Sequence, residues 1–400
     1  MQELLKAQFP IFEKYPDLIY LDNAATTQRT RSVIEAINQF NAFENSNIHR
    51  GVYDLSNHAT QAYEKTRQQV AHFLGVQGAH TIAFTKGTTE SVNIVAHSFL
   101  RHRLEPGDNM VVTIMEHHAN FIPWQMLAKQ TGSELRVLTV DTQGNLAMDQ
   151  LDDLLDKKTK ILSLNHVSNT LGTVNDIQSA IEMAHRKEIP VMIDAAQSAA
   201  YYDLNVNSLD YDFLAFSGHK MFGPFGIGVL YAHPKYHEEI RPFAYGGGMI
   251  KDVSVEETVF NDFPYNLDAG TANISAVVGL AKAIDFVSTL DKKWISEHLQ
   301  VLKQSLHEEL AGIEGVNLIG NPQKQSGIVS FTIDDIHPHD IASFFNQDQI
   351  AVRAGMHCTQ PLLSHLGVPA TVRVSFSVYN SSEEVNRLSY AVKELKKFWS

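Results

Sequence analysis

Strand-like and helix-like segments alternate through the middle of this chain, and the alternation limits the folds open to it. Residues 160–166 are rich in apolar and β-branched side chains, residues 175–187 place apolar side chains at helical spacing, and residues 190–194 are strand-like again. Two more short apolar segments follow, at residues 211–216 and 226–231. This order predicts a βαβ unit within a mostly parallel sheet covered by helices. Ligands of such sheets bind at the carboxyl ends of the strands.

A second strand-to-helix turn lies upstream. Residues 82–84 are strand-like, residues 86–90 read as a turn, and Val92, Val95 and Phe99 recur on one face of a following helix. The free N–H groups and threonine hydroxyls of such a turn can bind a small anion, although many of these turns hold only water.

The pattern changes near residue 285. Residues 327–333 and 371–378 are strand-like, and Ser381 with Glu384 forms a capping box before a final amphipathic helix. This predicts a smaller α+β domain, with a shared site in the cleft between the two domains. The predicted division is an N-terminal segment at 1–18 that packs with the small domain, a large α/β domain at 19–284, and a small α+β domain at 285–400.

The charge balance and the hydropathy of the chain exclude some classes of binding partner. The 400 residues carry 32 Lys and Arg against 45 Asp and Glu, a net charge of −13 that disfavours binding to nucleic-acid phosphates. No apolar window is long enough to cross a membrane, and the first twenty residues lack the pattern of a signal peptide. We therefore expect a cytoplasmic protein with neither nucleic acid nor membrane as a partner.

The single cysteine, Cys358, can form neither an internal disulfide nor a multi-thiolate metal site. Free cysteines are often buried packing residues, which is the simpler interpretation. However, Cys358 lies in a glycine- and proline-containing segment with Arg353 and His357 nearby, where a thiolate can be stabilised. Histidines such as His337 and His339 lack ligand partners at zinc spacing, so no metal site is expected.

Two charged residues follow neighbouring predicted strands. Lys220 comes after an apolar strand and before a glycine-rich turn, so its amine could form a Schiff base, although a solvated turn lysine is the simpler interpretation when Lys220 is taken alone. Asp194 ends the preceding strand, where it could cap a helix, form a salt bridge, or pair with the protonated ring nitrogen of pyridoxal phosphate. With the threonine turn, this set suits pyridoxal phosphate.

The motifs of the chain resemble those of the pyridoxal-phosphate enzymes of aspartate-aminotransferase fold, and within them the cysteine desulfurases of the SufS type. The resemblance runs almost from end to end. The residues that carry it are 20–25 (Tyr-Leu-Asp-Asn-Ala-Ala), 47–51 (Asn-Ile-His-Arg-Gly), 86–90 (Lys-Gly-Thr-Thr-Glu), 116–120 (Glu-His-His-Ala-Asn), 166–169 (His-Val-Ser-Asn), 217–220 (Ser-Gly-His-Lys), 269–271 (Ala-Gly-Thr) and 353–358 (Arg-Ala-Gly-Met-His-Cys).

The resemblance implies pyridoxal 5'-phosphate as the cofactor and assigns the residues that hold it. Lys220 would form the Schiff base, Asp194 would pair with the ring nitrogen, Gln197 would reach the ring hydroxyl, and His117 would stack on the ring. The phosphate and the remaining cofactor contacts would come from Thr88, Thr89, Ser217, His219 and Asn169, with Thr271 supplied by a second subunit. A homodimer follows from the assignment of Thr271.

The same resemblance implies the reaction. Arg373, with Asn169 and Arg353, would bind the α-carboxylate of L-cysteine, and Cys358 would accept the sulfur as a persulfide while L-alanine is released. His117 would move protons or would only stack on the ring. The sulfur would pass to an acceptor protein of iron-sulfur cluster assembly.

Several positions depart from the family pattern. Met356 stands where a histidine is common, Phe225 replaces a threonine, and Asp268 and Ala272 replace glutamate and proline, while the arginine usual before Asp268 is missing. None of them removes a catalytic group named above, and we expect them to bear on subunit contacts and on recognition of substrate or acceptor. The alternatives are a selenocysteine lyase or other pyridoxal-phosphate C–S lyase, an aminotransferase, and a non-catalytic scaffold of the same fold.

Overall fold

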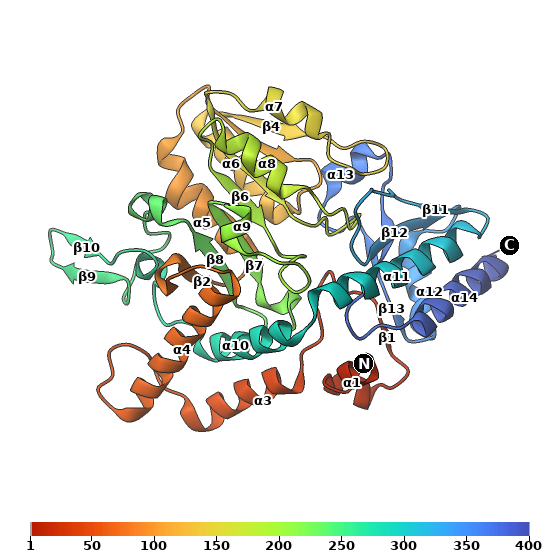
Figure 1. Ribbon diagram of the computed structural model, residues 1–400, viewed down its shortest axis with the longest axis horizontal. Coiled ribbons are helices and arrows are strands. Elements are labelled where there is room, and N and C mark those ends of the chain that lie inside the picture. The colour runs from red at the N-terminus through yellow and green to blue at the C-terminus, as the bar shows by residue number, and fades with distance from the viewer. Residues whose placement is uncertain (1, 400) are drawn as a thin grey trace.

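A seven-stranded sheet forms the centre of the larger part of the computed structural model, which describes residues 2–399 (Figure 1). Across the sheet the strands are β2 (Ile82–Thr85), β8 (Gly228–Ala232), β7 (Phe213–Ser217), β6 (Val191–Asp194), β5 (Thr159–Asn165), β3 (Asn109–Thr113) and β4 (Glu134–Leu138). Strand β8 is antiparallel to both neighbours, and the pairs from β7 to β4 are parallel. The predicted mostly parallel sheet is confirmed.

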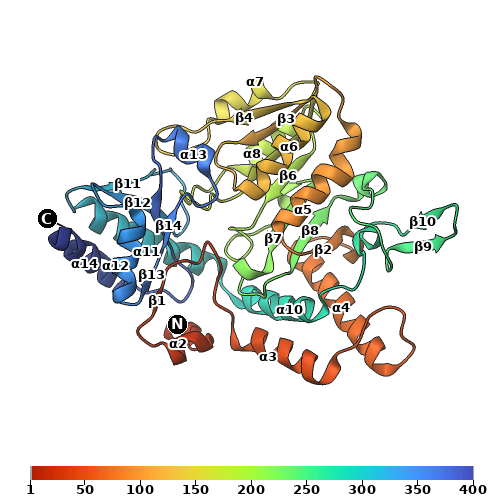
Figure 2. The same cartoon turned by 180° about the vertical axis from the view of Figure 1, so that it is seen from behind.

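Alternate side chains of the strands pack into two different cores. Ile193 and Leu214 join the helices of one face, whereas Met192 and Phe213 join those of the other. The first face is covered by α4 (Asp54–Phe73), α8 (Ile177–His185) and α10 (Ile274–Thr289), and the second by α5 (Thr88–Ile94), its continuation η3 (Val95–Leu100) and α6 (Ile122–Thr131). Figures 1 and 2 show the two faces from opposite sides. Burial on both faces explains the nearly continuous apolar runs in the strand sequences.

The C-terminal part holds a separate four-stranded antiparallel sheet. Its strands in order are β11 (Val316–Leu318), β12 (Ile328–Ile333), β15 (Thr371–Ser375) and β14 (Arg353–Gly355), and its helices are α11 (Lys292–Ala311), α12 (Pro338–Gln347), α13 (Gln360–His365) and α14 (Ser382–Trp399). The capping box is present, because Ser381 Oγ accepts the Glu384 N–H and the Glu384 carboxylate accepts the Ser381 N–H, each at 3.2 Å. The boundary predicted after residue 284 falls inside α10 and stays a prediction.

The N-terminal segment lies against the C-terminal part. The Lys6 ammonium is 2.6 Å from a carboxylate oxygen of Glu384, and β1 (Ile19–Tyr20) pairs in parallel with β13 (Ile350–Ala351). The remaining elements are α1 (Gln2–Lys6), α2 (Pro10–Lys14), α3 (Arg31–Gln39), α7 (Leu151–Leu154), α9 (Val206–Leu209) and the hairpin of β9 (Ile250–Val253) with β10 (Thr258–Phe260). Within residues 2–399, no helix combines the length and apolarity that a membrane span needs.

Two glycines bring the threonine turn close to the sheet. Gly87 has a φ of 151°, and a Cβ placed on Gly228 would lie 2.4 Å from the Gly87 Cα. Only glycine allows β8 to approach the turn so closely. The contact fixes the start of α5 beside the carboxyl end of β7, which is where the candidate site begins.

Candidate active site

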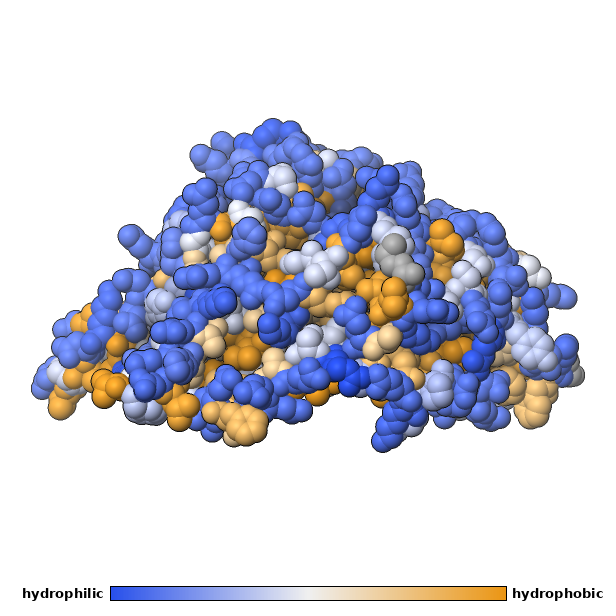
Figure 3. Space-filling view, turned by 60° about the horizontal axis from the view of Figure 1, so that its bottom comes forward, coloured by the Kyte–Doolittle hydropathy of each residue, from blue (hydrophilic) through white to orange (hydrophobic). Residues whose placement is uncertain are grey.

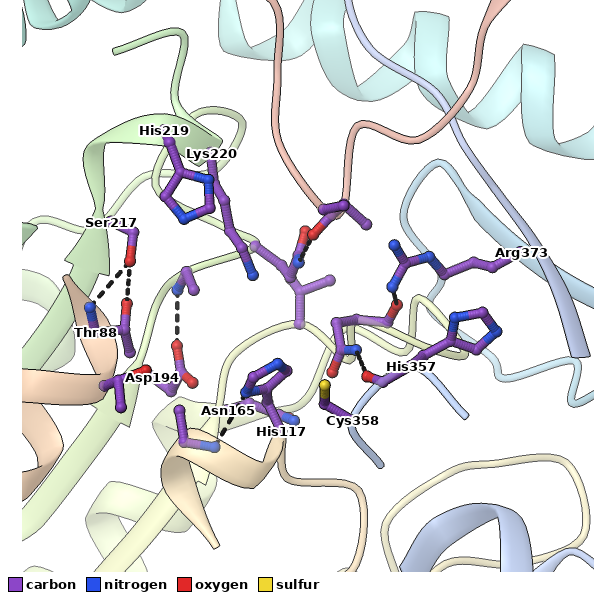
Figure 4. A pocket seen from close by; sticks show the side chains of 18 of the residues that line it. Thr88, His117, Asn165, Asp194, Ser217, His219, Lys220, His357, Cys358 and Arg373 are labelled. Carbon is purple, nitrogen blue, oxygen red and sulfur yellow. Dashed lines mark hydrogen bonds between the residues drawn. The ribbon is translucent and has the colours of Figure 1, made fainter. Parts of the chain in front are cut away.

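A cavity of about 220 Å³ lies between the carboxyl edge of the large sheet and the C-terminal sheet. Figure 4 shows its labelled side chains converging on one space. Every predicted site residue except Thr271 lines it: Thr88, Thr89, His117, Asn169, Asp194, Gln197, Ser217, His219, Lys220, Arg353, Cys358 and Arg373. The structure therefore brings together, within one chain, the amine of Lys220 and the thiol of Cys358. Thr271 lines a different cavity, together with His49 and Asp268.

The half-buried Lys220 and the buried Asp194 are two groups of opposite charge in this cavity. Lys220 ends the turn that follows β7, and Asp194 ends the adjacent strand β6. Burial lowers the pKa of Lys220 to about 8, while the charge of Asp194 partly offsets this effect. Burial also raises the pKa of Asp194, whose carboxylate accepts only the Ala196 N–H at 2.8 Å among the described residues. A cationic group of a ligand, placed beside the Asp194 carboxylate, would form the ion pair that this buried charge lacks.

The lowered pKa of Lys220 leads to a prediction for uptake of pyridoxal phosphate by the apoprotein. Only the unprotonated amine attacks an aldehyde, so the rate of forming the lysine-bound cofactor should rise with pH from about 7 to about 9. Stopped-flow absorbance measures this rate. Asp194→Asn should shift the profile to lower pH, because the Asp194 carboxylate favours the protonated amine. A midpoint near the ordinary pKa of lysine would contradict the assignment.

Hydroxyl groups gather where α5 begins. The Thr88 N–H donates to Ser217 Oγ at 2.9 Å, and the Thr88 and Ser217 hydroxyls are 2.9 Å apart. His219 lies on the same side of the cavity (Figure 4), and Thr89, the residue after Thr88, also lines the cavity. These side chains, with the helix N-terminus, form a donor set suited to an anionic phosphate.

His117 occupies the cavity as a neutral imidazole. Burial, with a smaller effect of the Lys220 charge, lowers the pKa of His117 to about 3. Its Nδ1 accepts the Ala119 N–H at 3.1 Å, so the proton of the neutral ring is on Nε2. His117 can therefore donate a hydrogen bond through Nε2, but it is not a cation at neutral pH.

The segment that carries Cys358 has an unusual backbone. His357 and Cys358 have φ values of 50° and 57°, in the left-handed region that costs about 1 kcal/mol for a residue with a side chain. The His118 N–H donates to the Cys358 carbonyl and the Asn169 amide donates to the His357 carbonyl, both at 2.8 Å. These bonds hold the thiol at the cavity while Cys358 remains exposed.

Arg373 is buried and already has two polar partners. Its guanidinium donates to the Asn169 carbonyl at 2.9 Å and to Asp22 at 3.0 Å, and Asp22 also lies 3.6 Å from the half-exposed Arg353. Asp22 thus holds both arginines and leaves the group with one net positive charge, which matches one carboxylate. Asp22 belongs to the motif at residues 20–25, but the sequence alone assigns it no role. Its conformation depends on pairing with the distant strand β15, which no local signal reveals.

Glu116 was missed in the same way. Its buried carboxylate accepts hydrogen bonds from Thr113 and Asn120 at 2.6 Å and from the Asn165 N–H at 2.9 Å. Burial raises the pKa of Glu116 to about 8. The network ties the turn that carries His117 to the end of β5, so Glu116 supports the site from behind.

The side chains present fit pyridoxal phosphate. Four buried atoms of the cavity residues, Asn169 Oδ1, His219 Nδ1, His357 Nδ1 and Arg373 Nε, have no hydrogen-bond partner within the described part of the chain. Buried polar atoms without partners are costly, so a polar ligand is expected there. The donor set at Thr88, the buried Asp194 carboxylate and the unprotonated form of Lys220 match a phosphate, a ring cation and an aldehyde respectively.

Comparison with known proteins agrees with this site. The profile described as "Aminotransferase class-V" matches residues 19–388. A probable cysteine desulfurase of Halalkalibacterium halodurans is 41% identical, over 99% of this chain and 98% of the relative. The crystal structure of the cysteine desulfurase CsdA (S-sulfonic acid) from Escherichia coli has a TM-score of 0.93 at 37% identity, covering 100% of this chain and 99% of that one. A C-DES mutant with glycine covalently linked to its PLP cofactor shares the fold, with a TM-score of 0.83 at 22% identity and coverage of 96% and 98%.

This chain belongs to the aminotransferase class-V family. The resemblance to cysteine desulfurases that the motifs implied is confirmed over the full length, as are the fold class and, through the family match, pyridoxal phosphate as cofactor. The roles of individual site residues stay predictions.

Proposed function

We propose that this chain, as a cysteine desulfurase, converts L-cysteine to L-alanine and receives the sulfur on Cys358 as a persulfide. The observation that carries the proposal is the meeting of Lys220 and Cys358, which come from different sheets, in one cavity. Pyridoxal phosphate, when bound, supplies an aldehyde for the substrate amine and a ring that accepts electrons from the α-carbon. Thr88, Thr89, Ser217, His219, Asp194, Gln197 and His117 would hold it.

The protein residues then have distinct tasks. Arg373 and Asn169 bind and orient the α-carboxylate, and the unprotonated Lys220 amine accepts the α-proton. The Cys358 thiolate attacks the substrate sulfur, so that an S–S bond forms and the C–S bond breaks. The electron pair of the C–S bond stays with the three-carbon product, which takes up protons to become alanine. No external oxidant or reductant is consumed. The Lys220 ammonium, which holds the α-proton, can supply a proton to the product, while the neutral His117 donates a hydrogen bond through Nε2.

Product formation without a second substrate tests the reaction class. Incubation of the holoenzyme with L-cysteine alone should release alanine, whereas an aminotransferase would need a keto acid. A scaffold of the same fold would release none. A protein that consumes selenocysteine but not cysteine would support the selenocysteine lyase alternative.

Arg373→Ala should raise the KM for L-cysteine by about 10- to 100-fold, because a charged hydrogen bond to the carboxylate is worth about 1.5–3 kcal/mol. Arg373→Lys keeps the charge but loses the planar pair of donors, so its KM for L-cysteine should lie between that of Arg373→Ala and that of wild type. Arg353→Ala should have a smaller effect, since its side chain is half-exposed. An unchanged KM in a folded Arg373→Ala protein would exclude this role.

We further propose that Cys358 delivers sulfur to an acceptor protein of iron-sulfur cluster assembly in the cytoplasm. The exposure of Cys358 and of Met356, two residues before it, supports delivery to a docked protein, and a lone free thiol suits a reducing compartment. Mixing the enzyme with L-cysteine, ferrous iron and a cluster scaffold tests this by the appearance of cluster absorbance. If no cluster absorbance appears on a scaffold that does form clusters when free sulfide is supplied, delivery of sulfur to cluster assembly is refuted. That result would not refute the conversion of L-cysteine to L-alanine. We expect neither nucleic acid nor membrane as a partner.

A homodimer completes the proposal, with Thr271 contributed to the other subunit's cofactor site. The face that carries α3 and α4 exposes five large apolar side chains, and we propose that a second copy of the chain covers them. They are Ile34, Phe43, Val52, Tyr53 and Leu55. Figure 3 shows this side of the molecule, with hydrophobic side chains among hydrophilic ones. Light scattering on the holoenzyme should give twice the chain mass of 44.7 kDa, and a monomer would refute this arrangement.

A further inference from the structure

Arg67 is a fully buried arginine outside the cavity of Lys220 and Cys358. It lies on α4, and each side-chain nitrogen has a partner. Its Nε donates to Glu64 at 3.1 Å, one terminal nitrogen donates to the Ile82 carbonyl at 2.7 Å, and the other donates to Asp268 at 3.1 Å. The Asp268 bond joins two segments about two hundred residues apart in sequence.

Aromatic rings enclose the Arg67 guanidinium. Its central carbon lies 5.2 Å from the Tyr63 ring centroid, 4.9 Å from that of Phe84 and 5.1 Å from that of Tyr265. Rings at these distances attract a cation and exclude water from it. The fully buried guanidinium is therefore held in one orientation, and it bonds Asp268 where that carboxylate lines the same cavity as Thr271.

Asp268 begins the short segment that ends in Thr271. The segment passes through Gly270, whose φ is 84° and whose N–H donates to the Gly247 carbonyl at 2.8 Å. Gly270 and Thr271 are exposed in the single chain. The side-chain bond of Asp268 to Arg67 is thus the buried attachment of an otherwise exposed segment.

We propose that Arg67 is a positioning residue, which holds Asp268 and through it sets Thr271 for contact with the cofactor phosphate of the second subunit. The inference rests on the proposed dimer and on the Thr271 contact within it.

Asp268→Asn tests the proposal in the full-length dimer, because asparagine has nearly the same size but cannot form the ion pair. The dissociation constant of pyridoxal phosphate, measured by titrating apoprotein, should rise about 10-fold. Alanine production should return close to wild type at saturating cofactor, and light scattering should still report a dimer. Asp268→Glu should recover part of the affinity. Asp262→Asn is the matched control, since this exposed carboxylate of the same loop pairs with Lys251 and should bind cofactor like wild type.

A double-mutant cycle separates positioning from general stability. Thr271→Ala should also weaken cofactor binding, and Asp268→Asn combined with Thr271→Ala should bind no more weakly than Thr271→Ala alone. The role of Arg67 would be overturned if the two substitutions weakened cofactor binding additively. It would also be overturned if Asp268→Asn bound cofactor normally while Thr271→Ala bound it more weakly. Either result would leave the proposed function intact. Normal binding in Thr271→Ala would instead refute the contact between subunits, and with it this inference.

Discussion

Cys358→Ser should lower alanine production from L-cysteine by at least about 10³-fold, because a serine hydroxyl is not ionised at neutral pH and cannot take sulfur from the substrate. The cofactor should bind normally, since Cys358 lies on the opposite side of the cavity from Ser217 and Thr88 (Figure 4). The absorbance of the lysine-bound cofactor should therefore be unchanged. Alanine and cofactor absorbance are measured on the same samples.

Met356→Leu is the matched control for this variant. Met356 is exposed on the same segment and lies outside the cavity lining, so its loss should leave alanine production near the wild-type rate. Selenocysteine gives a further comparison. Selenide leaves more readily than sulfide, so Cys358→Ser should keep part of its activity on selenocysteine. Full activity of Cys358→Ser on L-cysteine would show that the thiol takes no part in the reaction.

Lys220→Ala should abolish both the absorbance of lysine-bound cofactor and alanine production, the latter by about 10⁴-fold or more, because one amine serves as attachment point and proton acceptor. Thr88, Ser217 and Asp194 remain, so cofactor should still bind without a covalent bond. Equilibrium dialysis measures that binding and absorbance reports the linkage.

Lys292→Ala controls for loss of a half-buried lysine. Burial lowers the pKa of Lys292 to about 8 as well, but its ammonium donates to the Ala200 carbonyl away from the cavity. This variant should keep the absorbance of lysine-bound cofactor. Persistence of that absorbance in Lys220→Ala would mean that another amine holds the cofactor.

Much of the large sheet could be predicted because its strands are buried on both faces. The predicted strands at 160–166 and 190–194 correspond to β5 and β6, and periodicity also located α8 between them. The antiparallel direction of β8 was not predicted, since a short apolar run carries no information about direction. Strand β15 ends at Ser375, three residues before the predicted end, although the apolar sequence continues to Val378.

Motifs located the cavity-lining residues, but they did not show what supports them. Asp22 bonds Arg373, 351 residues away, and Glu116 bonds the Asn165 N–H, 49 residues away, besides its near neighbours Thr113 and Asn120. Neither spacing nor composition predicts these distant contacts. Arg67 is similar, because a helical arginine is usually expected at the surface. Its burial becomes intelligible only when Asp268 and three rings are seen around it.

The most direct test of sulfur transfer is the mass of the peptide that contains Cys358. After holoenzyme is treated with L-cysteine and its thiols are blocked by alkylation, that peptide should gain the mass of one sulfur atom, and the gain should disappear on reduction. Lys220→Ala treated in the same way should show no gain. A wild-type enzyme that releases alanine while its Cys358 peptide never carries the extra sulfur would contradict transfer through this thiol.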